Sequence, residues 1–233
     1  MFLLLALGLC HADDIDVSKL KVPPGFHIAV VADTESCGAR ALAWSPGGTL
    51  LTTCVDEGEV LALPGAEKGS AQRVVPVLKD LSGPHGIAFH GGKLYVAETE
   101  KLVAYDWDQQ NLRASNPHKV ADLPSSGGGH MTRTVLFYND KIYVAAGSSC
   151  NVCKDDDARR AAVMEFNLDG SGMRVYASGL RNAVGLAVNP ATKTIWATDN
   201  GIDWLGDNEP PEEVNELVDG GNYGWPYCYG DKV

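Results

Sequence analysis

The stretch "SSGGGHMTRT" at residues 125–134 places a histidine between three consecutive glycines and a Thr-Arg-Thr sequence. A neutral imidazole can take a proton from a hydroxyl group near neutral pH, so His130 is a candidate general base. Consecutive glycines cost backbone entropy on folding and let the main chain approach another group closely. We therefore expect Gly127, Gly128 and Gly129 to bring His130 close to a ligand.

Basic and polar side chains recur at the start of four similar segments, "ARALAWSPGGTLLTT", "PHGIAFHGGKLYVAE", "TRTVLFYNDKIYVAA" and "AVGLAVNPATKTIWAT". A single histidine or arginine at such a position is most often a structural residue, but recurrence in all four segments favours a shared ligand site. Arginines would suit an anion with carboxylates. The recurring residues are Arg40, His85, His130 with Arg133, and Arg181 with Asn182.

The four segments also indicate the fold that positions these residues. Each has a short apolar strand, a polar turn and a second apolar strand, and the equivalent positions Trp44, Phe89, Phe137 and Val188 lie 45, 48 and 51 residues apart. This period is typical of β-propeller blades of four strands, whereas a Greek-key sandwich would not repeat at this spacing. Helical periodicity is nearly absent apart from "EEVNEL". We predict an all-β propeller whose loops into the innermost strands converge at one end of the channel.

An acidic loop follows the fourth segment, between Thr198 and Pro226. It combines carboxylates with a turn-rich main chain, which is what calcium requires of its oxygen ligands. The alternative is a solvated acidic loop in which "PPEEVN" forms a capped helical turn. Its acidic residues are Asp199, Asp203, Asp207, Glu209, Glu212 and Glu213.

Composition limits the class of protein. A chain of 233 residues, 45% hydrophobic and 21% charged, is ordinary for one domain or two small ones. Its net charge of −11 argues against binding to nucleic acid or an anionic membrane. No stretch reaches the roughly 20 apolar residues of a membrane span. Residues 1–12, "MFLLLALGLCHA", resemble a signal peptide without a basic n-region, so we expect a periplasmic or secreted protein with one domain over residues 13–233.

Five cysteines remain after the predicted signal peptide, which leaves one without a partner in a compartment where disulfides persist. The "CNVC" sequence at 150–153 is followed by Lys154 rather than by the histidine of a c-type haem site, and a second CxxC for zinc is absent. A local disulfide or a redox-inert pair is the better interpretation.

Four motifs occur in the order that a known family has them: "GGGHMTRTV", "GSSCNVCKDDDARRAAVMEFNLDGSG", "GLRNAVGLAVNP" and "NGIDWLGDNEPPEEVNELVDGGNYGWPYCYG". Through them the chain resembles the sorbosone dehydrogenase type of PQQ-dependent sugar dehydrogenase, related to soluble glucose dehydrogenase and fungal pyranose dehydrogenase. The resemblance runs over nearly all of residues 13–233. It implies a six-bladed propeller, of which about four blades are present here, with PQQ across the channel mouth and calcium beneath its quinone oxygen.

The resemblance also implies roles for individual residues. His130 matches the catalytic base that takes the proton from the C1 hydroxyl of a sugar while hydride passes to the quinone. Arg181 matches the arginine at the quinone oxygens, and Asn182 lies beside it. Arg133, His85 and Arg40 are assigned to the cofactor site from the repeat alone.

The calcium residues follow from the same resemblance. Gly201 falls where the family donates main-chain carbonyls to the cofactor calcium, and Ile202 stands where a relative has proline. Glu213 and Tyr223 match positions that hold a second, structural calcium in relatives, although the insertion "IDWLGDNEPP" disturbs the alignment there.

Two alternatives to a sugar dehydrogenase stay open at this point: a non-catalytic propeller that binds other proteins, and a calcium-dependent propeller lactonase. The dehydrogenase would pass its electrons to an external acceptor, a cytochrome or a quinone. Because four repeats fill the chain and the family has six, we expect a C-terminally truncated ring. Residues 13–233 alone should be poorly soluble and inactive, with Cys228 separated from its partner.

Overall fold

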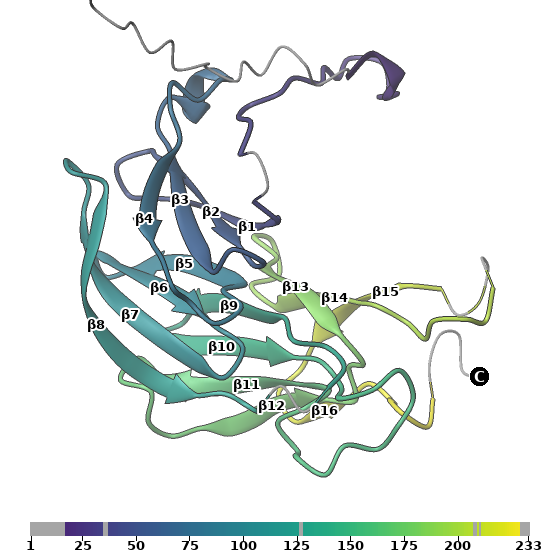
Figure 1. The fold of residues 1–233 in the computed structure, drawn as a ribbon. Helices are drawn as coiled ribbons and strands as arrows, with labels where there is room; N and C mark the ends of the chain where they lie inside the picture. Colours follow the sequence, from purple (N-terminus) through teal and green to yellow (C-terminus); the bar gives the residue numbers. More distant parts are fainter. Residues whose placement is uncertain (1–16, 35–36, 126–127, 207–208, 210, 229–233) are drawn as a thin grey trace, which may run out of the picture.

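The computed structural model describes residues 17–34, 37–125, 128–206, 209 and 211–228. Within these ranges the chain is almost entirely β-structure, with two short 3-10 helices, η2 (Val17–Lys19) and η3 (Ala66–Lys68). The strands form four sheets arranged in an arc around a central hollow (Figure 1). In this part of the chain no helix has the length and apolar character needed to cross a membrane. The predicted signal peptide lies outside the described residues.

The strands of each sheet follow one another in sequence order with antiparallel neighbours, apart from one late strand that pairs parallel at the edge of the third sheet. The first sheet contains β1 (Ala39–Trp44), β2 (Leu50–Cys54), β3 (Glu59–Leu63) and β4 (Val75–Leu78). The second contains β5 (Gly86–His90), β6 (Lys93–Ala97), β7 (Lys101–Asp108) and β8 (Arg113–Asp122). The third contains β9 (Arg133–Tyr138), β10 (Lys141–Ala146), β11 (Ala162–Asn167), β12 (Arg174–Ser178) and the late strand β16 (Gly221–Asn222), which pairs parallel with β12. The fourth contains β13 (Ala183–Val188), β14 (Ile195–Asp199) and β15 (Glu213–Leu217).

The first strand of each sheet is the innermost one. Strand β1 lies beside β5, β5 beside β9, and β9 beside β13, so the inner strands follow the sequence order around the hollow. The four positions that defined the repeat occupy the last or last but one residue of these strands and pair with the start of the next strand in the same way. These pairs are Trp44 with Leu50, Phe89 with Leu94, Phe137 with Ile142, and Val188 with Ile195. The prediction of a propeller with about four blades is confirmed.

The local sequence explains why each inner hairpin forms. The second strands, such as "KLYVA" in β6 and "KIYVAA" in β10, are nearly continuous apolar runs, and their side chains are buried because sheets pack on both faces. The connecting turns need two residues with positive φ. Gly91 and Gly92 supply them before β6, and Asn139 with Asp140 supply them before β10.

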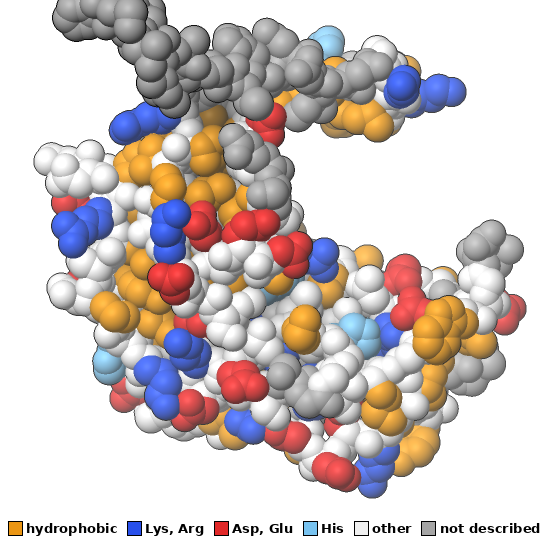
Figure 2. Space-filling model, viewed as in Figure 1, with side chains coloured by type: hydrophobic (Ala, Val, Ile, Leu, Met, Phe, Trp, Pro, Cys, Tyr) orange, Lys and Arg blue, Asp and Glu red, His pale blue; other side chains and the backbone are white. Residues whose placement is uncertain are grey.

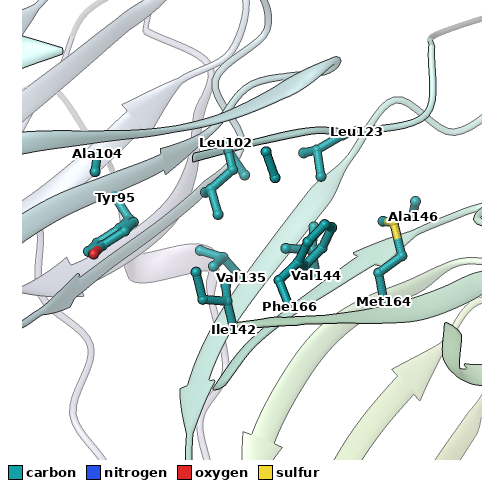
Figure 3. Close-up of a cluster of buried hydrophobic side chains, with 12 residues drawn as sticks. Tyr95, Leu102, Ala104, Leu123, Val135, Ile142, Val144, Ala146, Met164 and Phe166 are labelled. Atoms are coloured by element: carbon teal, nitrogen blue, oxygen red, sulfur yellow. The ribbon is translucent and has the colours of Figure 1, made fainter. Parts of the chain in front are cut away.

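Three apolar clusters join neighbouring sheets. In the central one, side chains of β6 and β7 face those of β9, β10 and β11 (Figure 3). The first and second sheets share a similar cluster around Leu51 and Val96, and the third and fourth share one around Val163 and Ala197. Because protein interiors are close-packed, these contacts fix the sheets relative to one another and thereby fix the loops at the channel mouth.

The segment after β14 corrects one sequence interpretation. The "EEVNEL" stretch, which we read as helical, forms strand β15, whose Asp199↔Glu213 and Ile195↔Leu217 pairs join it to β14. The strand alternates between more and less exposed residues, which is the period of a strand and not of a helix. Tertiary pairing therefore outweighs the local helical pattern.

The cysteines form two disulfides, Cys37–Cys54 and Cys150–Cys153. The local bridge within "CNVC" confirms one of the two readings of that motif. The sequence alone did not show that Cys37 pairs with Cys54. Cys228 is exposed and without a disulfide partner among the described residues, in line with the odd cysteine count.

Candidate functional site

The predicted site residues gather at the end of the hollow where the chain enters the inner strands. A cavity of about 340 Å³ lies at the mouth, between the residues that precede β1 and β5 and the Met131–Thr132 segment before β9. A second cavity of about 420 Å³ is lined by the inner strands β1, β5, β9 and β13. Arg40 and His85 line both cavities. Figure 2 shows the hollow side of the arc, with acidic, basic and histidine side chains along its border.

Arg40 and His85 form a pair between the two cavities. Arg40 donates from Nε to His85 Nε2 at 3.1 Å, and His85 Nδ1 lies 3.4 Å from the carbonyl oxygen of Arg133. His85 therefore carries its proton on Nδ1, and its lone pair is occupied by Arg40. Burial, with the charge of Arg40 adding to it, lowers the pKa of His85 to about 4. At neutral pH His85 orients Arg40 and does not exchange protons.

His130 has the opposite arrangement, because its contacts among the described residues are made by Nδ1 and not by Nε2. Its Nδ1 lies 3.0 Å from the carbonyl oxygen of Ser148 and 3.1 Å from Ser148 Oγ. Ser148 Oγ donates its own hydrogen to the carbonyl oxygen of Cys150 at 2.7 Å, so the ring must donate from Nδ1 and keep its lone pair on Nε2. Burial lowers the pKa of His130, and the positive charge of Arg181 contributes. A neutral imidazole with a free Nε2 is what a general base requires.

Gly128 and Gly129, beside His130, approach the protein main chain closely. Gly128 and Gly129 have φ of 104° and 66°, which side chains of L-residues rarely allow. A Cβ on Gly129 would lie 2.2 Å from the carbonyl carbon of Ser149 and 2.6 Å from the nitrogen of Cys150. These two glycines therefore pack the His130 loop against residues 149–150. Gly127 lies outside the described residues.

Arg181 is the second predicted catalytic residue, and its side chain is almost fully buried. It donates from Nε to the carbonyl oxygen of Asn151 at 3.0 Å, from Nη1 to that of Asn200 at 3.0 Å, and from Nη2 to Asn151 Oδ1 at 2.6 Å. Nη2 also lies 3.3 Å from a carboxylate oxygen of Asp203. On one side the guanidinium carbon lies 5.6 Å from the centre of the Trp225 ring, a cation–π distance.

Asn182 connects Arg181 to His130. The Asp199 carboxylate accepts hydrogen bonds from the main-chain nitrogens of Arg181 at 2.9 Å and Asn182 at 2.6 Å, which fixes the turn that carries both. A Cβ on Gly147 would lie 2.5 Å from Asn182 Oδ1 and 2.7 Å from His130 Cβ. The structure therefore brings His130, Arg181 and Asn182 together around Gly147.

Arg133 was predicted to contact the cofactor. In the structure its guanidinium donates hydrogen bonds to main-chain carbonyl oxygens of the loop that carries His130. Its side chain is fully buried, and it donates to the carbonyl oxygens of Pro124 at 2.8 Å, His130 at 3.1 Å and Thr132 at 2.8 Å. Burial lowers the pKa of Arg133 to about 10, so the guanidinium stays charged at neutral pH.

Sequence reasoning missed Arg160, which, like Arg133, donates hydrogen bonds to main-chain carbonyl oxygens around His130. It donates to the carbonyl oxygens of His130 and Gly147, each at 3.2 Å, and to that of Ser125. Two buried arginines thus hold the main chain of His130. The motif "DDDARRAAV" contains Arg160, but only its burial distinguishes it from the half-buried Arg159 beside it.

A small cavity of about 20 Å³, large enough for one water or ion, lies beside Arg181. Three of the four predicted metal residues, Gly201, Glu213 and Tyr223, line it, and Ile202 does not. The hydroxyl of Tyr223 donates to the carbonyl oxygen of Glu216 at 2.6 Å and accepts from the nitrogen of Val218 at 2.9 Å, so Tyr223 offers its ring to the cavity.

The charge at this cavity suits a cation. Asp199 also lines it, and burial, with the Glu213 carboxylate adding to it, raises the pKa of Asp199 to about 7. A bound cation would offset that burial of negative charge. Among the described residues no group of three or more His, Cys, Asp or Glu side chains is placed to hold a metal, so a calcium here would need main-chain carbonyls as well.

Comparison with known proteins relates this geometry to a family. A family model described as TrAA12-like matches residues 20–231. A "Pyrroloquinoline quinone-dependent sugar dehydrogenase" from Hypocrea jecorina (strain QM6a) is 25% identical over 97% of this chain and 64% of its own length. An uncharacterized protein of Borreliella burgdorferi is 28% identical over 99% of this chain and 62% of its own length.

A solved structure has the same architecture. The iodide structure of the Trichoderma reesei enzyme of carbohydrate-active enzyme family AA12 superposes with a TM-score of 0.74 at 25% identity, and the match covers 86% of this chain and 58% of that one. This chain thus spans about three fifths of the length of each of these relatives.

Proposed function

The chain belongs to the TrAA12-like family. From that premise we propose that it carries the cofactor and substrate site of a PQQ-dependent dehydrogenase that oxidises a sugar or related aldose at C1. The observation that carries this proposal is the state of His130. Its Nδ1 proton is held by Ser148, its pKa is lowered by burial, and its Nε2 lone pair is left for a hydroxyl group. The reaction class and the sugar follow from the similarity to the Hypocrea jecorina dehydrogenase.

The residues at the mouth suit an anionic, planar cofactor such as PQQ. Arg40 borders the cavity of about 340 Å³, and Arg181 supplies a buried positive charge close to His130. When bound, PQQ supplies the two-electron acceptor. The chain itself would hold the sugar hydroxyl against His130 Nε2, remove its proton there, and stabilise negative charge through Arg181.

The cavity of about 20 Å³ is the place where the chain would hold calcium. Gly201 lines this cavity, and its carbonyl oxygen would be a ligand. Its N–H donates to a carboxylate oxygen of Glu212 at 3.1 Å, which holds this part of the loop. Calcium bound there would supply a positive charge that polarises a neighbouring carbonyl. Glu213 and the buried Asp199 would balance that charge.

Two further parts of the proposal concern the setting of the enzyme. The two disulfides support an oxidising compartment, so we propose a periplasmic or secreted protein. Electrons would leave through an external acceptor, a cytochrome or a quinone.

Reconstitution tests the proposal directly. The full-length gene product is incubated with PQQ, calcium and a panel of aldoses, and the reduction of an artificial dye is followed. Dye reduction that needs both PQQ and a sugar is the expected result. Calcium-dependent lactone hydrolysis without PQQ would assign the chain to the lactonase class. Binding of protein partners with neither activity would make it a non-catalytic module.

A further inference from the structure

The loop Ser148–Cys153, here called the disulfide loop, touches both predicted catalytic side chains. The Cys150–Cys153 bridge closes it. At one end Ser148 receives the Nδ1 hydrogen of His130, and at the middle Asn151 receives two hydrogen bonds from Arg181. The main-chain nitrogen of Ser148 also donates to the carbonyl oxygen of Arg181 at 2.8 Å. Among the described residues, this loop is the segment that accepts hydrogen bonds from both the His130 and the Arg181 side chains.

Asn151 is the residue through which the loop controls Arg181. Its carbonyl oxygen accepts from Arg181 Nε, and its Oδ1 accepts from both Arg181 Nη2 and, at 3.1 Å, the main-chain nitrogen of Asp203. Its Nδ2 donates to the carbonyl oxygen of Asp203 at 3.3 Å. One side chain thus ties the guanidinium to the segment that follows Gly201.

The other partners of Arg181 are weaker or less specific. Asp203 lies 3.3 Å away with a side chain that is 69% exposed, and an exposed ion pair contributes little. Asn200 contributes one carbonyl oxygen. A guanidinium has five N–H donors, and the contacts to Asn151, Asn200 and Asp203 use four of them, which leaves one N–H on Nη1 for a ligand. Asn151 decides in which direction that N–H points.

The disulfide keeps Asn151 in place. A bridge over so short a loop removes many of the conformations that the loop would otherwise sample. The loop is anchored further by the Ser148 Oγ bond to Cys150, by a bond from the Ser149 nitrogen to Asp155 at 2.8 Å, and by the packing of Gly129 against it. Without the bridge, the main-chain acceptor for Arg181 Nε would lose its fixed position.

We propose that Asn151, presented by the Cys150–Cys153 disulfide, is the positioning residue that holds the Arg181 guanidinium ready for an anionic ligand. The inference rests on the proposed function for the identity of that ligand, PQQ. Its structural half, the immobilisation of Arg181, is independent of the ligand.

Three asparagine variants of the full-length protein test this. The affinity for PQQ is measured by the change in PQQ absorbance, and the hydrogen exchange of the Arg181 guanidinium N–H groups is measured by NMR without cofactor. Asn151→Ala should weaken PQQ binding about tenfold or more and make the Nη2 hydrogens exchange quickly, because the charge-assisted bond from Nη2 to Asn151 Oδ1 is lost while the main-chain acceptor of Nε remains. Asn151→Asp keeps the acceptor and should stay within about threefold of the wild type. Asn111→Ala, in an exposed turn where the side chain contacts Asp108, is the matched control and should change neither readout.

The disulfide is tested separately. Cys150→Ser with Cys153→Ser should make both the Nε–H and the Nη2 hydrogens of Arg181 exchange quickly, whereas Cys37→Ser with Cys54→Ser, which also removes one bridge, should leave them protected. If the first double variant does not fold, the Asn151→Ala result decides alone.

The outcomes separate this inference from the proposed function. Protected Nη2 hydrogens and unchanged PQQ affinity in Asn151→Ala would overturn the role of Asn151. Fast exchange in Asn151→Ala combined with no PQQ binding by the wild type would uphold the positioning of Arg181 and overturn PQQ as the ligand.

Discussion

At the scale of the residue, the histidines before two successive inner strands differ in whether their Nε2 lone pair accepts a hydrogen bond from a described residue. His85 and His130 both lie before an inner strand, His85 directly before β5 and His130 three residues before β9, yet Arg40 uses the Nε2 lone pair of His85, while Ser148 takes the Nδ1 proton of His130. The partner of each ring decides which nitrogen keeps a lone pair. The sequence indicates His130 as the base and His85 as a cofactor residue, and the hydrogen bonds leave the Nε2 lone pair of His130 able to accept a proton.

The role of His130 predicts a specific defect. His130→Ala should lower turnover about 100-fold or more and leave PQQ affinity within a few-fold, because the base is lost while Arg181 and Arg40 remain. Steady-state dye reduction and PQQ absorbance titration measure the two quantities in the full-length protein. His118→Ala, on the exposed side of β8, is the control and should behave as the wild type. Near-normal turnover of His130→Ala would remove His130 from the mechanism.

Burial of His85 predicts a pH dependence of stability. Its folded pKa of about 4 lies below the ordinary value of 6.5, so it stabilises the fold fully above pH 6.5, and that contribution is lost as the pH falls toward 4. Asp199, with a raised pKa, titrates with the opposite sign, so the difference between wild type and His85→Gln is the quantity to measure. Urea unfolding should show this difference shrinking by on the order of 2–3 kcal/mol between pH 7.5 and 4.5. An equal pH dependence of the two proteins would contradict the neutral, buried state of His85.

At the scale of the element, the sequence predicts the inner hairpins well and the loops poorly. The repeat fixes strands such as β5 and β9 because apolar runs and turn residues act locally. The segment "EEVNEL" fails because a short amphipathic stretch fits either period, and its pairing with β14 is a tertiary effect. The contact between Gly129 and Ser149 is also tertiary, since residues twenty positions apart meet there. The loop contacts of Arg133 and Arg160 could not be read from the sequence for the same reason, because burial decides what a guanidinium donates to.

The loop between β14 and β15 predicts a calcium dependence. Chelation of the full-length protein should abolish PQQ-dependent dye reduction, and added calcium should restore it, because the ion offsets the negative charge of the buried Asp199 and of the half-buried Glu213. Glu213→Gln should weaken calcium binding about tenfold by calorimetry. Tyr223→Phe is the matched comparison and should weaken it little, because that hydroxyl is bonded to main-chain groups. Full activity after chelation would eliminate the calcium site.

At the scale of the whole molecule, each sheet is stabilised by burial against the next. Three apolar clusters join the four sheets in sequence order, and a closed ring would need further blades to cover the two ends of the arc. The arc is open on one side (Figure 1). Large apolar side chains are exposed on strands of the first and last sheets and just after β15: Leu42 64%, Trp44 52%, Val214 66% and Val218 57%.

This openness predicts the behaviour of residues 13–233 when they are expressed alone. Exposed apolar side chains and unpaired strand edges favour association between copies, so the protein should form oligomers or aggregates at about 10–100 µM in analytical ultracentrifugation. Val214→Lys places a charge on the exposed face of β15 and should reduce that association. Val152→Lys, at another exposed valine in the disulfide loop, should not. The same preparation should fail to reduce a dye with PQQ, calcium and sugar, because an open arc of four sheets does not enclose the cofactor site. A soluble monomer with PQQ-dependent turnover would show that four blades are sufficient.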